Sequence, residues 1–113
     1  MGAWDINDKT PGFGSTLDLL IIALCRDYER REEAILSKSC GARVFMEYQY
    51  LNYRISEAAC ETAGSSYART YINEIGKKIG YAGSKIPYIS ESTYKTEKQA
   101  VKLAIARKLA LID

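Results

Sequence analysis

Apolar side chains recur every three or four residues along most of this chain, and no segment alternates apolar and polar residues as a half-buried strand does. A period of 3.6 residues places such side chains on one face of a helix. The chain is therefore expected to be all-α. Its 113 residues suit a single domain, residues 1–113, folded as a compact bundle of about four helices.

Residues 1–14 lack this period and contain glycine and proline, so we interpret them as an N-terminal arm. The arm carries Trp4, which is the only tryptophan of the chain, and Phe13. Aromatic side chains in a short arm usually dock on the body of the domain. The alternative is that Trp4 anchors a binding partner.

Residues 15–64 are expected to form a two-helix core. The first helix should run from residue 15 or 16 to about residue 37, with its charged second half, RDYERREEAI, in water. The second should run from about residue 42 to residue 63, because Gly64 is a typical residue after a helix end.

The second helix carries an additional apolar stripe opposite its core face, formed by Met46, Tyr50 and Tyr53. Two interpretations remain open. The stripe packs against another helix of the same domain, or it forms a dimer or partner surface, where exposed methionine and tyrosine are common.

Residues 65–113 form the basic part of the chain. A third helix is expected from residue 65 or 66 to about residue 79, weakened near its end by Gly76 by roughly 1 kcal/mol relative to alanine. Residues 80–89 contain two glycines and a proline, which predicts a loop with one short helical turn at most. Residues 89–113 are expected to form one long last helix that starts after Ser90, whose hydroxyl can accept the N–H of Thr93 as an N-cap.

The last helix has two distinct faces. Its apolar face carries Tyr94, Val101 and Ile105, and the opposite face combines lysine with short hydrogen-bonding side chains. The members of that opposite face are Ser92, Lys95, Thr96, Gln99 and Leu103. A helix that reads the DNA major groove needs such groups.

The charge of the chain is unevenly distributed. Residues 1–64 have seven Lys/Arg against ten Asp/Glu, a net charge of −3, whereas residues 65–113 have nine against four, a net charge of +5. An anionic partner would therefore meet the C-terminal half. The alternative is an ordinary solvated helix face rich in lysine.

Several kinds of chemistry find little support in the residues. The chain has no histidine, which removes the commonest general acid–base group and argues against an enzyme. Its three cysteines are widely spaced, so neither a zinc site nor a disulfide framework is expected. We expect no cofactor and no metal. No segment is long and apolar enough to span a bilayer or to act as a signal peptide, and we expect a cytoplasmic protein.

The run ISESTYK at residues 89–95 resembles the recognition-helix end of sigma-factor region-4-like helix-turn-helix domains, together with the residues that follow it, Lys98, Ala100, Leu103, Ala106 and Leu109. It resembles more closely the C-terminus of ArpU/RinA-type phage transcriptional regulators. The whole chain also looks like a small prophage-encoded protein of Gram-positive gut bacteria.

This resemblance implies that the third helix supports the last one in a C-terminal helix-turn-helix-like unit and that the last helix faces DNA. A standard unit joins its helices by three or four residues, but here about ten intervene. Residues 81–86 form a short extra helix, or the loop is a wing, or the unit is of another kind.

The leading hypothesis is a small phage-derived DNA-binding protein, a transcriptional regulator that binds double-stranded DNA. Phosphates would be bound by lysine side chains, and bases by hydroxyl and amide groups. The complete candidate set is Lys77, Lys78, Lys85, Ser92, Thr93, Lys95, Thr96, Gln99 and Lys102. Leu103 is a candidate for contact with a thymine methyl group.

The alternative is a phage-encoded protein that inhibits a host defence nuclease or its nucleic-acid complex, as an anti-CRISPR protein does. It rests on the small size, the lack of catalytic residues and the spare apolar stripe. Its candidate partner surface consists of Trp4, Met46, Tyr50 and Tyr53. A homodimer is a further possibility for the same surface.

Overall fold

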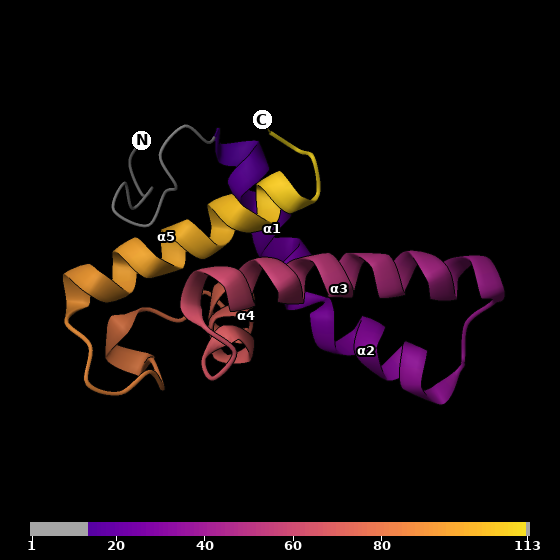
Figure 1. Ribbon diagram of the computed structural model, residues 1–113, viewed down its shortest axis with the longest axis horizontal. Coiled ribbons are helices and arrows are strands. Elements are labelled where there is room, and N and C mark those ends of the chain that lie inside the picture. The colour runs from indigo at the N-terminus through magenta and orange to yellow at the C-terminus, as the bar shows by residue number, and fades with distance from the viewer. Residues whose placement is uncertain (1–13, 113) are drawn as a thin grey trace.

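The computed structural model describes residues 14–112 and contains only helices and loops within that range (Figure 1). The all-α prediction is confirmed. In chain order, the elements are α1 (Ser15–Arg26), α2 (Tyr28–Ser37), α3 (Ala42–Ala63), α4 (Ala68–Gly76), a 3-10 turn η2 (Tyr81–Gly83) and α5 (Glu91–Lys108).

The long helix α3 organises the fold. It extends along the length of the molecule, with α2 beside its N-terminal half and α5 packed across its C-terminal half (Figure 1). Helix α1 packs mainly on α4. The core lies where these helices meet, and its largest fully buried apolar side chains are Tyr71, Tyr94, Ile21, Ile55, Ile72, Ile75 and Ile105.

The predicted first helix is divided in two at Asp27. A buried arginine, Arg31, accounts for the break. Its Nη2 donates to the carbonyl oxygen of Leu24 at 2.6 Å, an oxygen that would accept the N–H of Tyr28 in a continuous helix. Its Nε donates to Oδ1 of Asn52 on α3 at 2.7 Å. The expectation that this charged segment lies wholly in water is therefore wrong for Arg31.

Helix α3 has the predicted bounds, and Gly64 follows it with a φ of +85°, a backbone angle that glycine adopts without strain. Helix α4 is shorter than predicted and ends at Gly76. This glycine is buried where α4 meets α1. A Cβ atom at Gly76 would lie 2.6–2.8 Å from backbone atoms of Arg26 and Cys25. The glycine therefore permits close packing of α4 against α1, a role that its low helix propensity does not predict.

Helix α5 begins as predicted. The Ser90 hydroxyl accepts the N–H of Thr93 at 3.2 Å, so the N-cap is confirmed. The loop before it contains the short helical turn η2, also as predicted. The helix ends at Lys108, earlier than the sequence pattern indicates.

The loop is held against α4 by one buried carboxylate, Glu74. Its Oε1 accepts the hydroxyls of Ser84 and Tyr94, each at 2.8 Å, and its Oε2 accepts the N–H of Lys85 at 2.7 Å. A buried carboxylate that accepts several hydrogen bonds stabilises the groups around it. Glu74 thus fixes the loop and the N-terminal half of α5 in one position.

Replacing Tyr94 with phenylalanine is expected to lower the free energy of unfolding by about 1.5–3 kcal/mol, because it removes a hydrogen bond to a charged acceptor. Urea denaturation measures this loss. The matched control is Tyr53→Phe, which removes a hydroxyl from an exposed tyrosine. Equal stability of the two variants would contradict the role given to Glu74.

Candidate nucleic-acid interface

The exposed face of α5 lies at its N-terminal half. Ser92, Thr93 and Thr96 are exposed, and Lys95 and Gln99 are half-buried. Three of these side chains, Ser92, Thr93 and Thr96, line a shallow depression, together with Thr62 at the end of α3 and with Glu97 and Ala100. The structure therefore leaves the hydroxyl groups of this face accessible to a ligand.

Lys102 does not belong to this face. Lys102 is 3% exposed and Asp18 of α1 is 2% exposed. The Nζ atom of Lys102 lies 3.1 Å from Oδ1 of Asp18. A buried ammonium group needs a paired anion, and Asp18 supplies it. The prediction that Lys102 binds phosphate is wrong, because the long apolar stem of lysine lets it follow the buried side of the helix.

Lys98 is also buried, with its apolar stem along the buried side of α5. Its Nζ donates to the carbonyl oxygen of Ile79 at 2.9 Å and lies 5.7 Å from the centroid of the Tyr94 ring. Two of the lysines of α5 thus support the loop and the core. The surface of α5 therefore carries less positive charge than the number of lysines in its sequence suggests.

Three lysines of the candidate set remain exposed: Lys77, Lys78 and Lys85. None forms an ion pair with another described residue of the chain. Lys77 and Lys78 directly follow α4, and Lys85 lies in the loop between η2 and α5. In Figure 1 this loop leads into the first turn of α5. The segment that leads into α5 therefore carries three exposed lysines that form no ion pair with another described residue.

The remaining cations of α5 differ in their surroundings. Lys95 pairs with Glu91 at 3.3 Å, a partly exposed i,i+4 contact of the kind that contributes little stability. Lys108 pairs with Glu57 and Glu61 of α3. Arg107 was absent from the predicted set, yet it is exposed. It follows Thr96 by eleven residues, a spacing that returns to the same helix face.

The connection between α4 and α5 is longer than a helix-turn-helix turn. It includes the 3-10 turn η2, and the Tyr81 hydroxyl donates to the carbonyl oxygen of Ile89 at 2.8 Å. Of the three alternatives for this segment, a short extra helix is present only as that single turn. Helix α5 packs more extensively on α3 than on α4.

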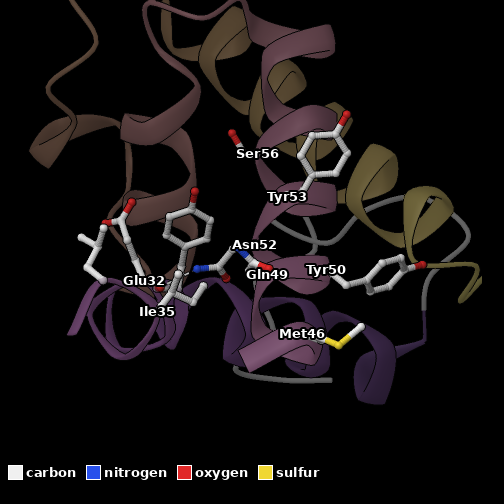
Figure 2. A pocket seen from close by; sticks show the side chains of 10 residues that line it. Glu32, Ile35, Met46, Gln49, Tyr50, Asn52, Tyr53 and Ser56 are labelled. Atoms are coloured by element: carbon white, nitrogen blue, oxygen red, sulfur yellow. Dashed lines mark hydrogen bonds between the residues drawn. The ribbon is translucent and has the colours of Figure 1, made fainter. Parts of the chain in front are cut away.

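The candidate partner surface on α3 is also exposed. Met46, Tyr50 and Tyr53 are 68%, 50% and 63% exposed, so the interpretation that they pack inside the domain is wrong. They border an open groove of about 710 Å³ between α2 and α3 (Figure 2). Trp4, the fourth residue of this set, lies outside the described residues.

The three cysteines are unpaired thiols. Cys25 lies in the core, where burial raises the pKa of its thiol to about 12. Its environment therefore disfavours the reactive thiolate. Among the described residues, no group of three or more Cys, Asp or Glu side chains is arranged to hold a metal ion.

The chain matches no family model, no curated protein and no solved structure with which it was compared. No helix within residues 14–112 is both long and apolar enough to cross a membrane.

Proposed function

We propose that this protein binds double-stranded DNA through the N-terminal half of α5 and acts, without enzymatic activity, as a transcriptional regulator of the phage-derived kind that its C-terminal segment resembles. The observation that supports this most directly is the exposure of the Ser92, Thr93 and Thr96 hydroxyls at the start of α5, which follows a segment with three exposed lysines. Bases are read by short polar side chains, and phosphates by cations around them.

The first turn of α5 has a second property that suits an anionic ligand. The N-terminus of an α-helix carries a partial positive charge from its aligned peptide dipoles. Lys77 and Lys85 lie in the segment between α4 and α5 that leads into this first turn. The dipole and the lysines therefore attract the same phosphates, while Thr96 and Gln99 reach toward base edges.

The contacts that hold α5 in the fold also favour this proposal. Recognition of bases requires a helix that keeps its orientation, and here α5 is held by Glu74 at its first turns and by the Lys102–Asp18 ion pair further along. Two of the lysines of α5, Lys98 and Lys102, thus orient the helix. The DNA contacts are assigned to the other lysines and to Arg107.

Replacing Lys77 or Lys85 with glutamine is expected to reduce the slope of log K against log salt concentration by about 0.9 for each lysine removed, because each lost phosphate contact releases fewer counterions. Fluorescence anisotropy with a labelled duplex, titrated at several salt concentrations, measures the slope. Glutamine keeps most of the side-chain length, so the change is mainly one of charge.

The matched control is Lys38→Gln. Lys38 is also exposed, but it follows α2, away from the first turn of α5 (Figure 1). Its replacement should leave the slope close to that of the unmodified protein. A slope that falls equally in all three variants would show that binding depends on total charge alone, and no binding at roughly 50 mM salt would overturn the proposal.

A further inference from the structure

We propose that Glu97 of α5 recognises cytosine in the DNA major groove by accepting a hydrogen bond from the 4-amino group of that base. This inference rests on the proposed function, because it assigns the base that the exposed face of α5 selects. Glu97 is half-buried and lines the depression of about 350 Å³ that also contains Ser92, Thr93 and Thr96. It was absent from the predicted set, which held only lysine, hydroxyl and amide side chains.

The carboxylate of Glu97 is held by a buried partner. Its Oε1 atom accepts the hydroxyl of Tyr71 at 2.5 Å. Tyr71 is fully buried, and its ring stacks on that of Tyr94 at a centroid distance of 5.8 Å, so the donor is itself fixed by packing. Burial raises the pKa of Tyr71, and the hydrogen bond to Glu97 raises it further, so the hydroxyl stays protonated. A carboxylate oriented in this way binds a ligand without losing further side-chain freedom.

The other oxygen of this carboxylate is available to a ligand. Among residues 14–112, no second group donates a hydrogen bond to Glu97, and no cation forms an ion pair with it. Glu91 of the same helix, in contrast, pairs with Lys95. Ala100 follows Glu97 by three residues, lines the same depression and is too small to cover the carboxylate. The depression therefore contains one unpaired acceptor among several hydroxyl groups.

The chemistry of this acceptor selects one base. A carboxylate accepts hydrogen bonds and donates none. In the major groove, guanine presents only acceptors, thymine an acceptor and a methyl group, and adenine an amino group beside the acceptor N7. Cytosine presents an amino group without an acceptor on the same base edge, so it suits a carboxylate best. The hydroxyls of Thr93 and Thr96 can donate to O6 of the paired guanine.

The charge of Glu97 gives selectivity at the expense of affinity. A carboxylate beside DNA repels the phosphates and weakens binding to every sequence. Against a base that has no donor, it also loses its water without gaining a hydrogen bond. A wrong base pair at one position of a binding site weakens binding about 5- to 150-fold. We expect this range for the replacement of the cytosine that Glu97 contacts.

The first test selects duplexes from a library with a randomised segment, at about 50 mM salt. The unmodified protein should enrich a C·G pair at one position. An analogue of that cytosine without the 4-amino group should weaken binding about fivefold or more, whereas the same analogue at a flanking cytosine should not. Duplex binding without a preference for cytosine would overturn this inference and leave the proposed function standing. Absence of binding to every duplex would overturn both.

The second test is Glu97→Gln. The buried Tyr71 hydroxyl needs an acceptor, so it should keep its bond to the side-chain oxygen and leave the amide nitrogen facing the depression. An acceptor thus becomes a donor. The variant should prefer guanine or thymine at the position where the unmodified protein selects cytosine. Circular dichroism verifies that the variant is folded. An unchanged preference for cytosine would overturn the inference.

The matched control is Glu91→Gln, which removes the same charge from the exposed first turn of α5. Both variants should bind all duplexes more tightly, because less negative charge opposes the phosphates. Only Glu97→Gln should change the selected base. An equal change of base preference in the two variants would show an effect of charge alone and would contradict the contact between Glu97 and cytosine.

Discussion

Replacing Lys102 with methionine is expected to lower the free energy of unfolding by about 3–5 kcal/mol, as measured by urea denaturation. The substitution preserves an unbranched apolar side chain but leaves the Asp18 carboxylate buried without its ammonium partner. Leaving one charge of a buried pair without its partner destabilises the fold strongly. Replacing both charges with apolar side chains changes the stability much less.

The control for this prediction removes both charges. Asp18→Leu/Lys102→Met should recover most of the lost stability, because buried ion pairs can often be exchanged for apolar side chains at little cost. The double variant remains informative if the single one does not fold. A loss below about 1 kcal/mol in Lys102→Met would contradict the buried pair, since that is the range of exposed ion pairs.

The same double variant separates the structural role of Lys102 from a role in DNA binding. Because Lys102 is buried, its removal in a folded protein should leave the salt dependence of DNA binding unchanged. Replacing the lysines that follow α4 should have the opposite effect. The protein should keep its full stability, and the slope of log K against log salt concentration should fall.

Replacing Gly76 with alanine is expected to lower the free energy of unfolding by about 3 kcal/mol, because overpacking at a close contact forces the surrounding structure to move. The new Cβ would meet backbone atoms of Arg26 and Cys25 on α1 at under 3 Å. Backbone cannot rotate away as a flexible side chain can, so α1 and α4 would have to separate. Thermal or urea unfolding gives the value.

The sign of this effect is diagnostic. Helix propensity alone predicts that alanine at this position stabilises by about 1 kcal/mol. The matched control is Gly80→Ala, where an added Cβ meets nothing within 4 Å. If Gly76→Ala were as stable as Gly80→Ala, the close approach of α1 and α4 would be refuted.

The elements predicted correctly from the sequence depend on local signals. The bounds of α3 follow from its apolar period and from Gly64, and the start of α5 follows from the Ser90 cap; each signal lies within a few residues of the feature that it determines. The break at Asp27 has no comparable signal. It depends on Arg31 reaching Asn52, a residue 21 positions away on another helix.

In the candidate site, too, the sequence predicted what depends on local signals and missed what depends on contacts between distant residues. Helical spacing placed Ser92 and Thr96 on the exposed face correctly. It assigned Lys102 to phosphate binding because lysine is usually exposed, and the sequence gives no sign that Asp18 is its partner. Arg107 could have been found, since its spacing from Thr96 returns to the same face.

The Asp18–Lys102 pair joins residues 84 positions apart in the chain. At synthesis rates of about 5–20 residues per second, α1 precedes its partner on the ribosome by roughly 4–17 s. During that interval the Asp18 carboxylate has no cation to accompany it into the core, so α1 cannot complete its packing on the nascent chain. The part of α1 around Asp18 therefore completes its packing late, after α5 has been made, and stays hydrated until then.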